Sequence, residues 1–459
     1  MIIPLLSLIT ILKIRDLSCA VTKSKSLIRK EQSFDDLPLR EPLYLRRVDG
    51  HLKYVMPSIG VELEEKEIKD GLQVFIQTDS KEELILACPG GKNTLRSQKT
   101  RRKKKQNTGS GTPKPIVFPI GRLECTERLP AVIDPSGHSC AKTGTRMEIG
   151  FKVGKDLDLV PLMSLCHDLI KADTLYVEHD LPSKICEATY FEPRPDFQEG
   201  PWPLYEDVPL KQIYTKEYQK QLFKELLGSE LNEPLLTSKY FLARGHLAPK
   251  ADFYYATWKW STFFYANAAP QWQIINAGNW KSLENYVRKV AAKTGEDLRI
   301  ITGTFGVLKM YSPKNKSSVE VYLHLNKVRV PAAFFKIIQS KATTKAIVAI
   351  CSNDPFATED TAPKELCMDI AAQNSWPDDK KEFSKGRIYF CDVGKFLKQV
   401  KTAPKISYKG ILQGIEESLN PPKISRVESD RERLERCLHS MLTRSKRLIS
   451  RSLRILRTP

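Results

Sequence analysis

The sequence contains no Cys-x-x-Cys pair, although ten cysteines occur among its 459 residues. This absence argues against a zinc ribbon or a thioredoxin-type motif, which both need closely spaced cysteines. Disulfide bonds in an oxidising compartment are then the expected use. Cys19 would leave with a cleaved leader. Nine cysteines remain, and their spacing does not give the pairing.

Long apolar runs are also lacking. Residues 2–12 have the length of the apolar region of a signal peptide, and Ser18 and Ala20 suit a cleavage site, although no basic segment comes first. We predict a signal peptide at residues 1–20, with a short buried or membrane-associated segment as the alternative. No other stretch reaches about 18 apolar residues, so we expect no stable membrane span. The sequence therefore predicts a secreted or luminal protein, and the glycan acceptor sequence at Asn315 fits this compartment.

Acidic residues are scarce in two segments, and these segments account for most of the net charge of +19. Residues 92–105 carry eight Lys or Arg and no acid, and residues 421–459 carry eleven against four. Subtracting +8 and +7 leaves +4 for the rest of the chain. Because the basicity is local, the high isoelectric point alone does not argue for nucleic-acid binding.

The chain divides into four parts by its pattern. The predicted leader is followed by a small, mostly β module at residues 21–140, whose basic loop 92–105 is either a solvated loop, a processing site or a phosphate-binding segment. Residues 145–405 mix strand patterns, such as 175–179 and 346–351, with a helix pattern at 216–227 that Gly228 ends. Residues 406–459 form a basic tail with apolar residues seven apart. We interpret this tail as an amphipathic helix for a partner, a membrane surface, nucleic acid or its own domain, outside the active site.

Polar side chains gather in one stretch of the third part, residues 240–288. Counted from His246, they follow at offsets of 21, 25, 30, 38 and 42: Asn267, Gln271, Asn276, Glu284 and Arg288. The last three have the spacing i, i+8 and i+12, which places them roughly on one side of a helix from residue 276 to about 293. This grouping suggests a functional site.

These residue types match the needs of phosphodiester hydrolysis. A histidine can deprotonate water near neutral pH, and an arginine can stabilise negative charge on phosphate. A hard divalent cation prefers oxygen ligands and retains water, so one amide ligand suffices for Mg²⁺. Taken singly, each residue also has an ordinary interpretation. His246 could be a turn histidine, Asn276 a helix cap, and Glu284 with Arg288 a surface ion pair.

The motifs RGHLAP, ANAAPQ and the Asn before GNW, together with Asp252-Phe253, resemble the DNA/RNA non-specific endonucleases, which include the secreted bacterial nucleases and mitochondrial endonuclease G. The similarity is greatest to arthropod-type secreted nucleases, sometimes described as dsRNases. It covers residues 145 to about 400, and the segment Cys88-Pro-Gly-Gly also resembles their N-terminal module. The resemblance implies an α+β fold, in which a ββα-metal (His-Me finger) nuclease domain with a mixed sheet core follows the small β module.

The resemblance also implies a role for each residue. His246 would be the general base, Asn276 the sole protein ligand of Mg²⁺ (with Mn²⁺ as a substitute), and Glu284 would hold a water molecule of the metal. Arg194 would stabilise the transition state, and the predicted substrate-binding residues are Arg244, Arg288, Asn267 and Gln271. The substrates would be DNA and RNA, including dsRNA, and the products would carry 5′-phosphates. A homodimer is left open.

One residue departs from the family pattern. The common motif is Asp-Arg-Gly-His, and this chain has Ala243 in place of the Asp. The secreted arthropod-type branch also carries Ala, so we expect activity. The alternative hypothesis is a catalytically weakened homologue that binds nucleic acid through its basic segments. A third hypothesis is a structural or membrane-surface protein organised by the tail.

Overall fold

The computed structural model describes residues 40–55, 58–60, 73–78, 84–90, 93, 95–97, 116–119, 123–153, 158–185, 194–201, 203–228 and 236–415. The predicted signal peptide, most of the basic loop and the basic tail lie outside the described residues, as do Cys19, Cys186 and Cys437. Among the described residues, no helix is long and apolar enough to cross a membrane.

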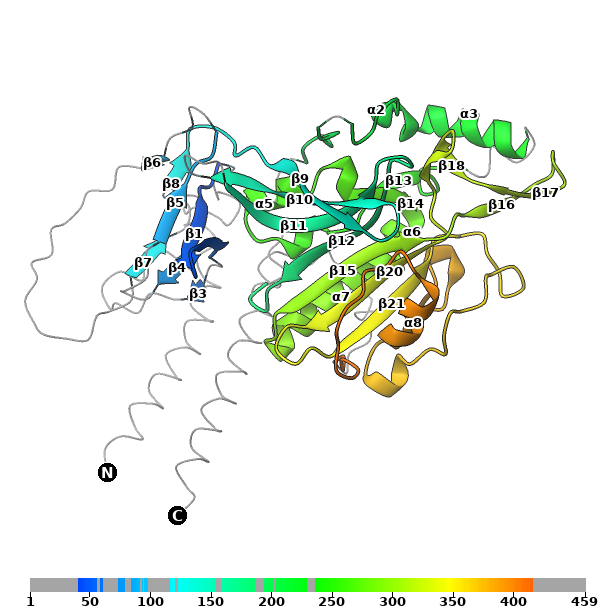
Figure 1. Cartoon of the computed structure of the whole chain (residues 1–459). Coiled ribbons are helices and arrows are strands. Elements are labelled where there is room, and N and C mark those ends of the chain that lie inside the picture. The colour runs from blue at the N-terminus through cyan, green and yellow to red at the C-terminus, as the bar shows by residue number, and fades with distance from the viewer. Residues whose placement is uncertain are drawn as a thin grey trace, which may run out of the picture.

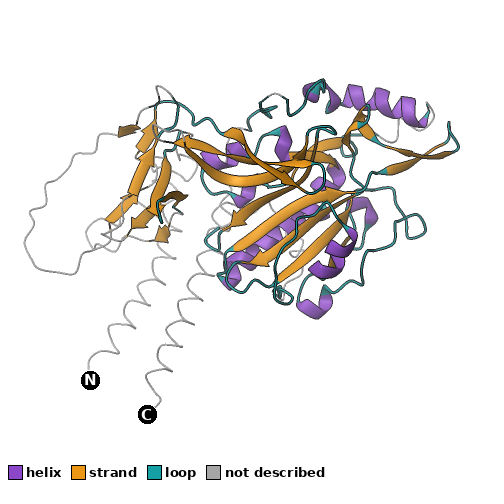
Figure 2. Cartoon of the chain, viewed as in Figure 1, coloured by secondary structure: helices purple, strands orange, loops and turns teal. Residues whose placement is uncertain are grey.

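An eight-stranded sheet dominates the fold, as Figure 2 shows in orange. Its strands lie in the order β22 (Ile388–Cys391), β21 (Ala346–Ser352), β20 (Ala333–Ser340), β15 (Leu298–Phe305), β12 (Asp173–Leu181), β11 (Asp158–Asp168), β10 (Gly144–Val153) and β9 (Val132–Cys140). β9 belongs to this sheet, so the sheet begins before residue 145, where the sequence placed the start of the nuclease domain.

All strand pairings in the large sheet are antiparallel. The strands β9 to β12 are consecutive and joined by short connections, and such connections make antiparallel neighbours. The sequence predicted a mixed sheet. In the described residues, the parallel part of this sheet is limited to an isolated bridge between Ala346 and Ile411. Helices lie outside the sheet, in agreement with an α+β fold (Figure 1).

Both faces of the sheet are covered, because alternate residues of the fully buried strand β20 pack in opposite directions. Phe334 packs against Trp280 of α7 (Asn279–Thr294), with 5.5 Å between ring centroids. Phe335 packs on the other face against Phe396 of α8 (Val393–Gln399), at 5.0 Å. The helix α7 is thereby fixed against the centre of the sheet, and this helix carries Glu284 and Arg288.

The N-terminal strands form smaller sheets beside the large one (Figure 1). The strands β1 (Leu43–Val48), β2 (His51–Tyr54) and β5 (Leu84–Ala87) make one sheet, in the order β2-β1-β5. A second sheet contains β3 (Ser58–Gly60), β4 (Gln73–Thr78) and β7 (Ile116–Pro119), and β6 (Leu95–Ser97) pairs with β8 (Leu123–Cys125). Tyr44 stacks on Tyr255, the residue before the helix α5 (Ala256–Ser261), with 5.2 Å between ring centroids. The N-terminal strands therefore pack against the nuclease part of the chain.

Two helices and two hairpins lie outside the large sheet. The helix α3 (Lys216–Leu227) ends at Gly228, whose φ of 97° favours glycine, and this confirms the predicted helix and its end. A short helix, α2 (Leu210–Ile213), precedes it. Two hairpins follow β15, one made of β16 (Lys309–Ser312) with β17 (Ser317–Glu320) and the other of β18 (Tyr322–His324) with β19 (Lys327–Arg329).

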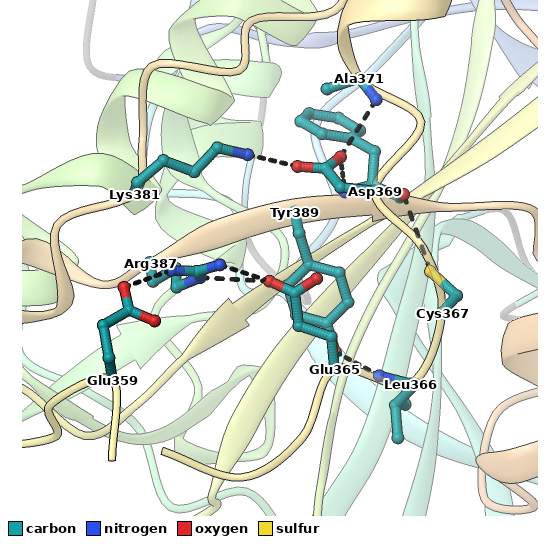
Figure 3. A network of polar contacts seen from close by, with 10 residues as sticks. Glu359, Glu365, Leu366, Cys367, Asp369, Ala371, Lys381, Arg387 and Tyr389 are labelled. Carbon is teal, nitrogen blue, oxygen red and sulfur yellow. Dashed lines mark hydrogen bonds and ion pairs between the residues drawn. The ribbon is translucent and has the colours of Figure 1, made fainter. Parts of the chain in front are cut away.

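Disulfides and a polar network hold the connections. The disulfides join Cys88 to Cys125, Cys140 to Cys166 and Cys367 to Cys391, and Cys351 is a buried free thiol. Figure 3 shows the network that holds the long connection between β21 and β22. There Arg387 binds Glu359 and Glu365, and Asp369 accepts the backbone N–H of Phe390 at 2.9 Å. This connection is therefore fixed although it contains little regular structure.

Candidate active site

The polar stretch folds into two antiparallel strands followed by helices. The strand β13 (Leu242–His246) pairs with β14 (Ala268–Trp272), and α6 (Gln273–Asn276) and α7 follow directly. His246 stands at the end of β13, opposite Ala268. The one continuous helix expected from residue 276 is thus two helices, which break at Ala277 and Gly278.

The imidazole of His246 lies between aromatic rings. Phe197 and Phe263 have ring centroids 5.1 Å and 4.9 Å from it. The Nε2 atom is buried and has no hydrogen-bond partner among the residues that the structure describes. Burial, together with the positive charges of Arg194, Lys250 and Arg244, lowers the pKa of His246 to about 3. The ring is therefore neutral near pH 7 and can accept a proton.

Two arginines lie beside His246. The guanidinium of Arg244 is 4.9 Å from the ring centroid of Phe197, and its Nη1 donates to the hydroxyl of Tyr265 at 3.4 Å. The guanidinium of Arg194 lies 5.6 Å from the ring centroid of Phe263 and is partly buried. Burial and the charge of Arg244 lower the pKa of Arg194. Two like charges at this point favour an anion such as phosphate.

The side chain of Asn267, a predicted substrate-binding residue, is engaged within the protein. Its side chain is fully buried, and its Oδ1 accepts the backbone N–H of Ala248 at 2.9 Å. Its Nδ2 donates to the carbonyls of Ala248 and Thr262, each at 2.9 Å. Because backbone groups occupy the amide, Asn267 positions the turn that follows His246.

Gln271 lies directly opposite Ala243 in the hairpin and is fully buried. Neither of its side-chain polar atoms has a partner among the described residues. The amide packs against Gly245, where an added Cβ would lie 2.5 Å from Gln271 Oε1. Gly245 is thus needed for this close approach, and Gln271 shapes the strand that ends at His246.

Asn276 is the last residue of α6 and is half-buried. Its Nδ2 donates to Gln273 Oε1 at 3.1 Å, and no group of the described residues donates to its Oδ1. Gly278, rather than Asn276, precedes α7, and no side chain caps that helix. The interpretation of Asn276 as a cap of the long helix is therefore wrong, and its amide oxygen remains as an acceptor.

Glu284 lies on α7 and faces charged side chains of both signs. Burial raises its pKa to about 7, against the opposing effects of Lys336 and Arg288. No described residue donates a hydrogen bond to its carboxylate. A carboxylate that titrates near neutral pH and has unused oxygens is a candidate for a role in catalysis.

Arg288 has a buried ion-pair partner that the sequence prediction missed. Its Nη1 lies 2.7 Å from Asp252 Oδ1, and the other oxygen of Asp252 lies 2.9 Å from His179 Nε2. Burial opposes the ionisation of Asp252, but the hydrogen bond of His179 and the charge of Arg288 lower its pKa to about 2. Arg288 therefore binds Asp252 in this structure, and its phosphate contact stays a prediction. The sequence signal was the Asp-Phe pair after RGHLAP.

Lys336 is a second residue that the sequence prediction missed. It lies in the middle of β20 with 1% of its surface exposed, and its Nζ donates to Thr302 Oγ1 at 2.5 Å. Burial lowers its pKa, while Glu284 and Asp252 favour its charged form. In the sequence, Lys336 is one lysine within an apolar strand. Its position near Glu284 becomes visible only in the folded structure.

The structure thus forms two polar groups. One contains His246, Arg194 and Arg244, and the other contains Glu284, Arg288, Asp252, His179 and Lys336. The turn η4 (Lys250–Asp252) connects them, because Lys250 acts on His246 and Asp252 binds Arg288. No described hydrogen bond or ion pair joins the two groups directly.

A neutral, half-buried imidazole with adjacent guanidiniums lies on this strand–strand–helix unit, and these groups suit chemistry on phosphate esters. The chain belongs to the DNA/RNA non-specific endonuclease family, whose sequence model matches residues 142–395. It is therefore a nuclease of the hydrolase class, and the family is generally metal-dependent.

Known proteins similar to this chain include two salivary endonucleases. The protein from Lutzomyia longipalpis is 26% identical over 392 residues, which cover 84% of each chain. The protein from Culex quinquefasciatus is 25% identical over 289 residues, 61% of this chain and 72% of the other. Among solved structures, the EndoG/EndoGI complex matches 46% of this chain and 79% of the other, with 20% identity and a TM-score of 0.30.

Proposed function

We propose that this protein is a secreted, Mg²⁺-dependent endonuclease that hydrolyses phosphodiester bonds of DNA and RNA, including dsRNA. The observation that carries the proposal is the neutral imidazole of His246, whose buried Nε2 has no partner among the described residues. As general base, it would take a proton from the water that attacks phosphorus. The bond from phosphorus to the 3′ oxygen then breaks, which leaves 5′-phosphate ends.

The donor set near α7 fits a hard cation. Within the described part of the chain, no three His, Cys, Asp or Glu side chains gather to hold a metal. Asn276 instead offers one amide oxygen, which accepts no hydrogen bond from a described residue. Glu284 offers a carboxylate that also accepts no hydrogen bond from a described residue. Such a set suits a cation that keeps most of its water, as Mg²⁺ does, with Mn²⁺ as a substitute. When bound, the cation would neutralise negative charge on the phosphoryl and leaving oxygens.

The remaining side chains have binding and orienting roles. We assign Asn276 as the direct ligand and Glu284 as the acceptor of hydrogen bonds from the waters that hydrate the cation. Arg244 would bind the phosphate that is cleaved, and Arg194 would stabilise the negative charge that this phosphate gains in the transition state. Asn267, Gln271 and Arg288 hold these groups in place through the contacts described above. These residues, on or beside the strands β13 and β14 and the helices α6 and α7, form the proposed ββα-metal site.

Contacts to phosphate rather than to base edges support a broad substrate range, since the backbone is common to all sequences. Export is supported by the disulfides, which persist in oxidising compartments. The N-terminal strands are proposed to be part of the exported enzyme.

A nuclease assay on wild type and His246→Ala tests the proposal. The purified protein is incubated with plasmid DNA, dsRNA and single-stranded RNA, with Mg²⁺ or with EDTA. We expect Mg²⁺-dependent cleavage and a loss of about 10²–10⁴-fold in rate for His246→Ala. Equal rates for both proteins would reject the proposal. Tight binding without cleavage under several divalent metals would instead favour the weakened, binding-only homologue that Ala243 suggests.

A further inference from the structure

The hairpin of β16 and β17 contains an acceptor sequence for an N-linked glycan. Asn315 and Ser317 are the first and third residues of Asn-Lys-Ser, and no other Asn-x-Ser or Asn-x-Thr sequence occurs among the 459 residues. Transfer of the glycan needs the amide of the asparagine and the hydroxyl of the third residue, with any residue except proline between them. The chain therefore offers one acceptor for this modification.

The acceptor sequence is accessible over its whole length. Asn315, Lys316 and Ser317 are all exposed. Asn315 lies in the connection 313–316, between Ser312 and Ser317, which are opposite each other in the hairpin. Its side-chain amide makes no hydrogen bond to a described residue, and only its backbone N–H is bound. A glycan on this amide therefore displaces no contact of the described fold and does not need room in the core.

The turn is held by groups other than the Asn315 side chain. Ser312 is fully buried, and its Oγ accepts the backbone N–H of Asn315 at 3.2 Å and donates to the carbonyl of Leu226 at 2.7 Å. Lys316 has a φ of 49°, in the left-handed region, so the chain reverses its direction there. The hairpin can therefore keep its shape when the amide of Asn315 is modified.

The position of the hairpin gives a glycan both space and a use. Figure 1 shows β16 and β17 projecting from the nuclease part of the chain, at the end remote from the N-terminal strands. Among the described strands these two pair only with each other, so each has an outer edge that no described strand covers. Tyr311, opposite Ser318, is also 62% exposed. Open strand edges are templates for pairing with another chain, and a bulky polar group beside them hinders such pairing.

We propose that Asn315 carries an N-linked glycan in the exported protein. The proposal rests on the export that is part of the proposed function. In the reaction, Asn315 Nδ2 forms a bond to the anomeric carbon of a lipid-linked oligosaccharide, and the bond from that carbon to the pyrophosphate oxygen breaks. The lipid pyrophosphate leaves with the electron pair, and the amide loses one proton. The attached glycan covers the tip of the hairpin and limits association through its open edges.

The test uses the full chain with its own N-terminus, expressed in cultured mammalian cells. The exported protein is treated with peptide N-glycosidase in water that contains heavy oxygen. This treatment should increase the electrophoretic mobility of the chain and convert Asn315 to an aspartate that carries the heavy isotope. Peptide mass spectrometry then assigns the labelled residue.

Two adjacent serines provide matched variants. Ser317→Ala removes the hydroxyl of the acceptor sequence, so this variant should migrate like the treated protein. Ser318→Ala changes the next residue, which is equally exposed, and should keep the glycan. Ser317→Thr retains a hydroxyl and should also keep it. All three should cleave nucleic acid at the rate of the parent protein, because no residue assigned to the reaction lies in the hairpin.

The protective role of the glycan is tested on the native protein. Light scattering is measured before and after treatment with the glycosidase under native conditions. Removal of the glycan should increase association, and Ser317→Ala should behave like the treated protein. Equal scattering before and after treatment overturns the protective role.

The outcomes separate the glycan from the nuclease. An exported chain with an unmodified Asn315 overturns the proposal and leaves the nuclease function standing. A chain that stays inside the cells without a glycan overturns both the glycan and the export. A glycosylated chain that cleaves no nucleic acid supports the glycan and rejects the proposed chemistry.

Discussion

The guanidinium of Arg288 lies 2.7 Å from the carboxylate of Asp252, and both side chains are buried. The helix α7 supplies the cation and the turn η4 supplies the anion, so this pair fastens the helix that carries Glu284 to the segment that follows His246. The active site consequently depends on residues that need not touch the substrate.

Breaking this pair should destabilise the protein. Asp252→Asn leaves the charge of Arg288 buried without its partner, and such losses cost about 3–5 kcal/mol. Urea unfolding of the wild type and the variant measures the difference. The control is Asp180→Asn, which breaks the exposed pair with Lys341 and should cost at most about 1 kcal/mol. Equal stability of the two variants would contradict the role of the buried pair.

The ionisation of Glu284 should set the acid limit of activity. Its pKa is raised to about 7, so the carboxylate takes up a proton, and activity falls, as the pH decreases through that region. The low pKa of His246 keeps the base neutral over the same range. We expect Glu284→Gln to remove this limb from the profile of kcat/KM against pH.

Lys336 should lower the pKa of Glu284 through its charge. Lys336→Met removes the charge at similar volume, so the pKa of Glu284 rises and the acid limb moves to higher pH. Arg288 and Lys281 on α7 and Asp252 on η4 also face Glu284 and stay unchanged in this comparison. Lys336→Arg serves as the control that keeps the charge. An acid limb at the same pH in Lys336→Met would show that the lysine only fills space.

Asn267→Ala should reduce stability and kcat rather than substrate affinity. The substitution leaves backbone groups of Ala248 and Thr262 without partners, at about 1–3 kcal/mol for each buried group. Thermal unfolding and steady-state kinetics measure both effects. Arg244→Met is the comparison, because loss of a phosphate contact should raise KM with little change in stability. A stable Asn267→Ala enzyme with only a raised KM would restore the substrate-binding assignment.

Removal of the cation should abolish activity, and Asn276 should determine how much cation is needed. EDTA should stop cleavage, and added Mg²⁺ should restore it. Asn276→Ala should raise the Mg²⁺ concentration for half-maximal activity by about 10-fold or more. Asn315→Ala, at the turn of the β16–β17 hairpin, is the control. Full activity in EDTA would argue against the metal-dependent mechanism.

Local patterns predicted the fold well where one element determines its own ends. The helix α3 and its end at Gly228 follow from apolar spacing and a glycine, and β21 follows from a short apolar run. The order of the strands could not be predicted in this way. β12 and β15 are neighbours in the sheet although more than a hundred residues separate them, and only packing decides such pairings.

For the candidate site, the sequence likewise predicted the residues but not their contacts. Sequence motifs brought His246, Arg194 and Arg244 to attention, and the structure places all three together. They did not show that Asn267 and Arg288 already have internal partners, because a motif gives residue types without their contacts. Lys336 comes from a strand remote in sequence, so no spacing rule connects it to Glu284.

The hydrogen bond from the backbone N–H of Ala256 to Glu41 Oε2, 2.9 Å long and buried, also bears on how the chain folds. It joins the first turn of α5 to the N-terminal strands across 215 residues. Contacts of such long range are slow to form, because the intervening chain must first lose its freedom. The N-terminal strands therefore dock late, and Trp258, which packs against Tyr54, should report that step as a slow fluorescence phase in refolding.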